Sequence, residues 1–225
     1  MTRRGVIVCG VGARGKYACL VSLVLFFLCF SVTPSLANSY PFDIFSDNGP
    51  WGTSGTNFED PDLNLFVEVT NGEGIVHFTF HNESQGALTD VSITDVYFDD
   101  GTLLGISDVI NGPGVSFSQV ASPSDLPGGS LLDPDFITTG LFSADADPPP
   151  AHSGVESGEF VTIQFDLIGG GVLQDVLGEL ADGRLRIGIH IQSFSDGSSE
   201  SALATPEPAT LLLLGLGMVM LRKRS

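Results

Sequence analysis

One-by-one alternation of apolar and polar side chains is the feature that most constrains this chain. Over residues 75–81, Val76, Phe78 and Phe80 alternate with His77, Thr79 and His81. The same pattern recurs over residues 160–168 and 185–191. Because successive side chains of a β-strand point to opposite faces of its sheet, this period of two predicts strands with one buried face and one solvated face.

Turn residues separate the predicted strands. Asn71-Gly72 precedes one of them, and Asp99-Asp100-Gly101 follows another, as expected for hairpin and loop connections. Strands are predicted over residues 63–70, 75–81, 91–98, 103–110, 115–120, 160–168 and 185–191. This regular spacing predicts a mainly β fold, a single β-sandwich of jelly-roll type.

Three segments do not follow the strand pattern. Residues 172–181 carry apolar residues at helical spacing and predict one short helix. Residues 121–158 contain six prolines and are predicted as a long loop. Residues 38–62 are predicted as loop with at most one short edge strand, and residues 193–205 as a polar linker.

The N-terminus has the three parts of a secretory signal peptide. Basic residues from Arg3 to Lys16 precede an apolar run over residues 18–32, and Ser35 and Ala37 place small residues at −3 and −1 of a cleavage site. We predict cleavage between Ala37 and Asn38. All three cysteines lie before this point, so the exported domain has no disulfide bond to stabilise it.

The C-terminus carries a second membrane-directed segment. Pro206-Glu207-Pro208 precedes 13 mostly apolar positions, residues 209–221, and a basic tail of Arg222, Lys223 and Arg224. As a helix the apolar run is about 20 Å long, short of the roughly 30 Å hydrocarbon core of a bilayer. It predicts a marginal membrane helix with the basic tail as a cytoplasmic stop.

This order of motif, apolar helix and basic tail resembles the PEP-CTERM sorting signal of Gram-negative bacteria, over residues 205–225. The resemblance implies export by the secretion machinery, recognition by an exosortase (an integral-membrane cysteine transpeptidase) and removal of the tail near the motif. It also implies a precursor anchored in the inner membrane, and then a cell-surface or matrix protein associated with exopolysaccharide. The expected organisation is a signal peptide (1–37), a β-sandwich domain (38–192), a polar linker (193–204) and the sorting signal (205–225).

Charge is concentrated between the two ends. Residues 38–205 hold 26 of the 27 acidic residues but only Arg184 and Arg186 of the nine basic residues, so their formal net charge is −24. A polyanion is repelled by such a domain, which excludes nucleic acid as the main partner. We expect the two arginines to pair with neighbouring acids.

Acidic residues at loops and strand ends suggest calcium, which takes six to eight oxygen ligands. The candidate ligands are Asp95, Asp99, Asp100, Asp145 and Asp147. None of these runs completes the Asp-x-Asp-x-Asp-Gly loop, so solvated acids remain the alternative. No catalytic residue is predicted, because the sequence has no zinc-protease motif, phosphate-binding loop or nucleophile elbow.

Histidines and aromatic residues are the remaining candidates for a functional site. His77, His81 and His190 are expected on solvent-exposed strand faces, and His152 in the proline-rich loop. Four aromatic residues of the exported part could either form a platform on which sugar rings stack or pack into the core. These four are Tyr40, Trp51, Phe58 and Tyr97.

Three functions follow from these features. The first is a non-catalytic surface or matrix protein sorted by an exosortase. The second is a calcium-dependent carbohydrate-binding module, and the third is an extracellular hydrolase that uses paired carboxylates.

Overall fold

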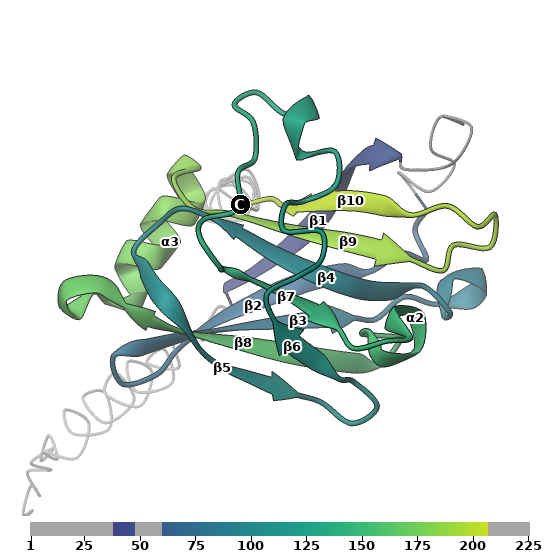
Figure 1. Cartoon of the computed structure of the whole chain (residues 1–225), viewed down its shortest axis with the longest axis horizontal. Coiled ribbons are helices and arrows are strands. Elements are labelled where there is room, and N and C mark those ends of the chain that lie inside the picture. The colour runs from purple at the N-terminus through teal and green to yellow at the C-terminus, as the bar shows by residue number, and fades with distance from the viewer. Residues whose placement is uncertain (1–37, 48–59, 207–225) are drawn as a thin grey trace, which may run out of the picture. The chain divides into compact units, whose positions relative to one another are not determined.

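The computed structural model describes residues 38–47 and 60–206. Ten strands form one antiparallel sheet in the order β5-β8-β3-β2-β1-β10-β9-β4-β7-β6 (Figure 1). Their bounds are β1 (Asn38–Asp47), β2 (Leu65–Asn71), β3 (Ile75–Asn82), β4 (Ser92–Asp99), β5 (Leu103–Asn111), β6 (Phe117–Gln119), β7 (Ser143–Ala146), β8 (Glu159–Leu167), β9 (Arg186–Gln192) and β10 (Glu200–Ala204). Two helices are α2 (Pro150–Ser153) and α3 (Leu173–Asp182), and short 3-10 turns lie at Gly86–Leu88, Gly129–Leu131 and Ile168–Gly170.

The sheet folds over along β1, which belongs to both halves. Its first residues, Asn38–Pro41, pair with β2, whereas Phe42–Asp47 pair with β10. The first half is β5-β8-β3-β2 with the start of β1, and the second is the end of β1 with β10-β9-β4-β7-β6. The prediction of a mainly β domain with two packed faces is confirmed, and the two faces are continuous through β1.

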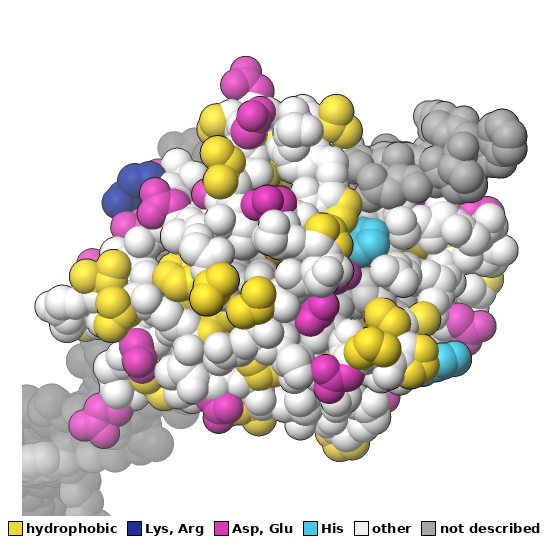
Figure 2. Space-filling model, viewed as in Figure 1, with side chains coloured by type: hydrophobic (Ala, Val, Ile, Leu, Met, Phe, Trp, Pro, Cys, Tyr) yellow, Lys and Arg dark blue, Asp and Glu magenta, His cyan; other side chains and the backbone are white. Residues whose placement is uncertain are grey.

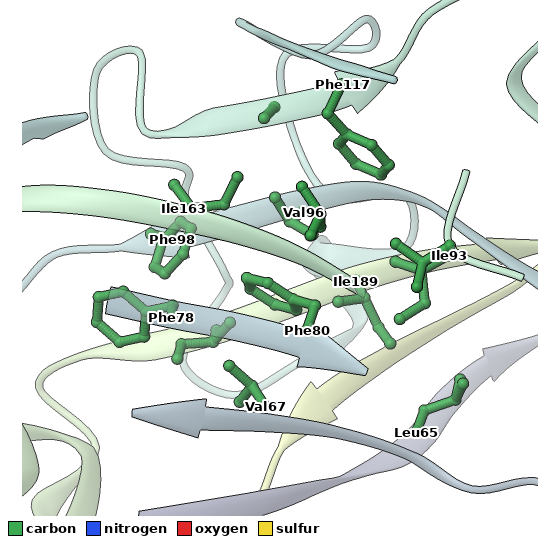
Figure 3. Packing of buried hydrophobic residues seen from close by; sticks show 14 of the residues in the cluster. Leu65, Val67, Phe78, Phe80, Ile93, Val96, Phe98, Phe117, Ile163 and Ile189 are labelled. Atoms are coloured by element: carbon green, nitrogen blue, oxygen red, sulfur yellow. The ribbon is translucent and has the colours of Figure 1, made fainter. Parts of the chain in front are cut away.

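The core lies between the two halves. Phe78 and Phe80 of β3 and Phe165 of β8 pack against Phe98 of β4, with ring centroids 4.7–6.1 Å apart. Figure 3 shows Phe78, Phe80 and Phe98 directed into the space between the strands, together with Ile163 and Ile189. Edge-to-face contacts of this kind stabilise a core beyond the burial of apolar area.

The far edges of the two halves approach each other through a side chain. The Nδ2 of Asn111, at the end of β5, donates to the carbonyl oxygen of Phe117 in β6, and its Oδ1 accepts from the Phe117 N–H. One amide side chain therefore replaces a backbone ladder at this point, and the sandwich is close to a closed barrel.

The predicted helix is present as α3, one residue later than expected. Val176 and Leu180 are buried against the core. Glu179 of α3 accepts a hydrogen bond from the Thr102 N–H, at 2.6 Å. Gly183 ends the helix with φ of 77°, a left-handed conformation that glycine adopts without strain.

Three segments predicted mainly as loop or linker contain more regular structure than expected. Residues 121–158 include β7 and α2, residues 38–62 include the internal strand β1, and the predicted linker 193–204 ends in β10. The linker prediction is wrong for residues 200–204, and the domain extends to Ala204. Strands β7 (Ser-Ala-Asp-Ala) and β10 (Glu-Ser-Ala-Leu-Ala) consist mostly of small or polar residues, so they lack the bulky alternation that reveals a strand.

The long loop between β6 and β7 covers the outer face of the second half. Tyr97 of β4 packs there with Ala121, Leu126 and Phe136 of the loop in a second small core. A Cβ atom at Gly188 of β9 would lie 2.5 Å from the Cδ2 of Leu126, so a larger residue there would force this side chain of the loop to move. Residues 121–142, which we name the cover loop, cross β4 and β9 in Figure 1.

Candidate functional site

The sorting motif begins directly after an internal strand of the sheet. β10 pairs with β1 on one side and with β9 on the other, and Ala204 is its last residue. The backbone N–H of Thr205 donates to the carbonyl oxygen of Pro41, at 2.9 Å, and the Thr205 hydroxyl donates to the same oxygen, at 3.3 Å. Pro206, the first residue of the motif, is exposed.

The predicted signal cleavage point lies at the same end of this strand pair. Asn38, the first residue after it, already belongs to β1, and its side-chain amide donates to the carbonyl oxygen of Val69 in β2. β1 and β10 are antiparallel, so the start of β1 and the end of β10 meet. We name the pairing of Pro41–Asp43 with Leu203–Thr205 the terminal clasp.

Most of the sorting signal lies outside the described residues. This applies to Glu207, Pro208, the apolar segment 209–221 and the basic tail Arg222, Lys223 and Arg224, and at the other end to Ala37 and the rest of the predicted signal peptide. No helix among the described residues is long and apolar enough to cross a membrane.

Two of the predicted calcium ligands come together. Asp95 of β4 and Asp145 of β7 are directly opposite each other in the strand register. Burial raises the pKa of the Asp145 carboxyl, and the neighbouring Asp95 raises it further, whereas the hydrogen bond from the Ser122 N–H, at 3.1 Å, acts in the opposite direction. The surroundings therefore disfavour the ionised form of Asp145.

The carboxylates of two other predicted ligands, Asp99 and Asp147, have partners of their own, whereas the bond of Asp100 is made by its backbone. Asp99 forms an ion pair with Arg186, and Asp147 accepts hydrogen bonds from the hydroxyls of Ser116 and Ser118. These two hydrogen bonds lower the pKa of Asp147. The N–H of Asp100 donates to the Thr139 hydroxyl. Within residues 38–47 and 60–206, no three acidic, histidine or cysteine side chains form a group able to hold a metal ion, and calcium binding stays a prediction.

His190 is the histidine that the sequence placed wrongly. It is 9% exposed rather than on a solvated face, and its Nδ1 lies 3.0 Å from Asp95 Oδ2. Asp95 also accepts a hydrogen bond from the Thr94 hydroxyl, at 2.7 Å. Both faces of β9 are covered, so a histidine at an outward position is buried and needs a polar partner.

The remaining histidines lie outside the core. His77 contacts Gln164 through a hydrogen bond of 3.0 Å, and His152 is well exposed in α2. His81 stacks on Phe66, with ring centroids 4.8 Å apart, and lies beside Phe160 at 6.1 Å. Phe66, His81 and Phe160 are paired in sequence across β2, β3 and β8, and we name these three residues the aromatic row.

The aromatic platform expected from the sequence is not assembled from its described members. Tyr97 is fully buried beneath the cover loop, where its hydroxyl donates to the carbonyl oxygen of Pro123, at 3.1 Å. Burial raises the pKa of Tyr97, and Asp95 and Asp145 add to this shift. Tyr40 packs partly buried against the main core, and Trp51 and Phe58 lie outside the described residues. The aromatic row was missed because two phenylalanines on strands are expected in the core.

The two internal arginines pair with acids, as expected. Arg184 contacts Asp182 and Glu179, both at 2.9 Å, and is mostly exposed. Arg186 contacts Asp99, donates to the carbonyl oxygens of Pro134 and Asp135, and lies over the ring of Phe136. Figure 2 shows acidic side chains spread over the viewed face and basic atoms at one edge, so the described surface is strongly anionic.

Comparison with known proteins identifies one region. The family model of the PEP-CTERM protein-sorting motif matches residues 204–224. No curated protein and no solved structure matches the chain. The chain thus carries a PEP-CTERM sorting signal, which marks it as an exported protein that an exosortase recognises.

Proposed function

We propose that this protein is a non-catalytic component of the cell surface or extracellular matrix, processed by an exosortase and associated with exopolysaccharide. The sorting motif supports this proposal, because it is joined directly to a single acidic β-domain. The precursor is held in the inner membrane by residues 209–221 until the tail is removed near Pro206-Glu207-Pro208. The domain then acts outside the membrane.

The charge of the domain restricts the kinds of polysaccharide that it can bind. With a formal net charge of −24 over residues 38–205, the domain repels an anionic glycan unless cations lie between them. A neutral or amino-sugar polymer, or an acidic polymer bridged by divalent cations, fits this surface. Calcium therefore belongs to the proposal as a bridging ion at solvent-exposed carboxylates. Of the predicted ligands Asp100 is exposed, whereas Asp95 is 5% exposed and already bonded to Thr94 and His190.

The sorting part is tested by replacing Pro206, Glu207 and Pro208 with alanine in the full chain. We expect an unprocessed precursor in the membrane fraction, and the same precursor for the unchanged chain in cells that lack the exosortase. Mass spectrometry of the mature protein gives the processed end. Normal maturation in both cases would refute the sorting role.

The polysaccharide part needs a separate measurement. The mature protein is mixed with the producer's own exopolysaccharide, with calcium and with chelator, and co-sedimentation is measured. We expect co-sedimentation, weakened by chelator if calcium bridges the two. Protein that stays in the supernatant under both conditions would contradict association with the polysaccharide.

The aromatic row favours a second candidate function, direct glycan binding. Phe160 is 37% exposed, and aromatic rings stack on the apolar faces of sugars. Neighbouring rows of the same sheet face present polar groups, including the hydroxyl pair of Thr79 and Thr162 at 2.9 Å. A module of this kind needs both features, rings for stacking and hydroxyl or amide groups for sugar hydroxyls.

Glycan binding by this face is tested with Phe160→Ala. Isothermal titration with fragments of the exopolysaccharide should show at least about a tenfold loss of affinity, the scale of one lost stacking contact. Leu104→Ala removes an apolar side chain that is still more exposed, 62%, from β5 and is the control. Equal affinity of the two variants would reject the aromatic row as the binding surface.

A further inference from the structure

The terminal clasp leaves almost no chain between the folded sheet and the processing motif. Thr205 alone separates the last residue of β10 from Pro206, and Thr205 itself is hydrogen-bonded to Pro41. From Ala204 to Ala209, where the apolar segment begins, five residue steps span at most about 18 Å when fully extended. The end of the folded sheet therefore lies close to the segment that anchors the precursor.

Access to the motif is restricted further because β10 is an internal strand. Leu203 is paired with Asp43 of β1 and with Gly188 of β9. A transpeptidase that cuts near the motif must hold several residues on each side of the bond in an extended form, with their backbone groups available. In the folded domain, the residues before Pro206 already use these groups in the sheet.

We propose that the terminal clasp controls processing: the exosortase acts on an opened form in which Leu203–Thr205 have separated from β1. This inference rests on the proposed exosortase processing of the chain. Fraying of the last residues of a strand is a low-energy local opening. The clasp closes again after processing, so the mature end of the protein is held in the sheet.

The geometry also favours opening at β1 rather than at β9. β1 contributes Pro41 to the Thr205 hydrogen bonds, and β1 begins at the residue that follows the predicted signal cleavage point. Signal cleavage releases the start of β1 from its upstream chain, and the strand end that holds Thr205 then becomes able to move. The β9 pairing of Leu203, by contrast, lies in the part of the sheet beneath the cover loop, whose Leu126 contacts Gly188.

The first test lengthens the chain between the clasp and the motif. Six Gly/Ser residues are inserted between Thr205 and Pro206 of the full chain, and conversion of precursor is followed by pulse-chase labelling in cells that contain the exosortase. We expect processing about tenfold faster, which corresponds to removal of an opening step of about 1.4 kcal/mol. The same insertion after Gly197, in the turn before β10, is the matched control and should leave the rate unchanged.

The second test locks the clasp. The double variant D43C/L203C places two cysteines on paired residues of β1 and β10, in a mature domain that has no other cysteine. We expect the oxidised form to be processed about tenfold more slowly than either single variant, and added reductant to restore the rate.

The outcomes separate this inference from the proposed function. Processing at the unchanged rate in both the insertion variant and the oxidised double variant would overturn control by the clasp, while leaving exosortase sorting intact. Processing of the unchanged chain in cells without exosortase would instead contradict the proposed function. If the double variant fails to fold, the insertion still decides the question, because it lies outside every strand.

Discussion

β3 and β4 lie in opposite halves of the sandwich and show opposite patterns of burial. In β3, every second residue is buried and those between are half-buried, whereas the first seven residues of β4 are all buried. The difference arises from the outer faces: the cover loop packs on Tyr97 of β4, while β3 presents His77, Thr79 and His81. Where the outer face is covered, the outward positions hold buried residues, as Tyr97 does in β4 and as Gly188 and His190 do in the alternating strand β9.

This difference suggests two kinds of stabilisation. The core between the halves depends on large apolar side chains, with Phe98 at its centre. The outer face of the second half depends on fewer apolar residues together with polar contacts, mainly those of Arg186 and Tyr97. The following experiments compare these regions, from the largest expected effect to the smallest.

The central core is tested with Phe98→Ala. Phe98 is fully buried, and its ring lies 5.0 Å from Phe78 and 4.7 Å from Phe165. Removing this ring leaves a cavity where the two halves meet, so we expect the free energy of unfolding to fall by about 3–5 kcal/mol. Urea denaturation measures the change.

Phe160→Ala is the control for this experiment, because Phe160 points outward from β8. Its loss should cost less than about 1 kcal/mol, as usual for a partly exposed side chain. Equal losses for the two variants would mean that the space between the halves is not the main core.

The attachment of the cover loop is tested with Arg186→Ala. The variant leaves the Asp99 carboxylate, which is largely buried, without its cation and removes the contacts to Pro134, Asp135 and Phe136. We expect a loss of about 3 kcal/mol, the scale for breaking one partner of a largely buried ion pair. Hydrogen exchange should also accelerate across residues 121–142.

Arg184→Ala is the matched control two residues away. The Arg184 side chain is 63% exposed and pairs with the exposed Asp182 and with the buried carboxylate of Glu179, which also accepts a hydrogen bond from the Thr102 N–H. Because the arginine end of both pairs is solvated and Glu179 keeps this second partner, its loss should cost less than that of Arg186, about 1 kcal/mol. If the two arginine variants lose equal stability, or if exchange in the cover loop is unchanged in R186A, Arg186 does not hold this loop.

These contacts show which parts of the fold were predictable from the sequence. Strands of the first half were predicted to within a few residues because their partly solvated outer faces impose alternation. β4 and β9 of the second half were predicted as closely, because they carry large apolar side chains. β7 and β10 were missed because they are short and rich in small residues. β1 was expected at most as a short edge strand because it follows no regular alternation, whereas it is a ten-residue internal strand. Their identity as strands depends on pairing with neighbours that are distant in the sequence.

The candidate sites also divide into those visible in the local sequence and those that depend on strand pairing. The sorting motif is local in the sequence: residues 205–225 were predicted from the order of their parts alone, and the family model matches residues 204–224. The aromatic row requires the register of β2, β3 and β8, and the terminal clasp requires the pairing of β1 with β10. The pairing of Asp99 with Arg186 joins residues 87 positions apart, so no local spacing distinguished a salt-bridged acid from a metal ligand.

A smaller effect is expected from Tyr97→Phe. The variant keeps the buried ring and removes only the hydroxyl that donates to Pro123 of the cover loop, at 3.1 Å. We expect a loss of about 1 kcal/mol, the net value of one hydrogen bond. If the cover loop is held as one unit, Y97F should cost less in the R186A background than alone. Additive losses in the double variant would show that the two contacts act independently.

The smallest effect concerns two neighbouring acids, Asp145 of β7 and Asp147, which follows the end of this strand. Burial and the neighbouring Asp95 raise the pKa of Asp145, so the folded state binds a proton more tightly than the unfolded chain. Stability therefore falls as pH rises from the ordinary carboxyl value through the raised one. Asp145→Asn removes this loss, and we expect a gain of less than about 1 kcal/mol at pH 7 that disappears in acid.

Asp147→Asn should change stability at pH 7 in the opposite direction. Hydrogen bonds from Ser116 and Ser118 lower the pKa of Asp147, so its contribution is present above the ordinary carboxyl value and is lost as pH falls through the lowered one. D147N should reduce stability at pH 7, whereas D145N should increase it. Urea denaturation between pH 3 and pH 7 compares the two variants. Changes of the same sign at neutral pH would show that burial beneath the cover loop does not distinguish Asp145 from its neighbour.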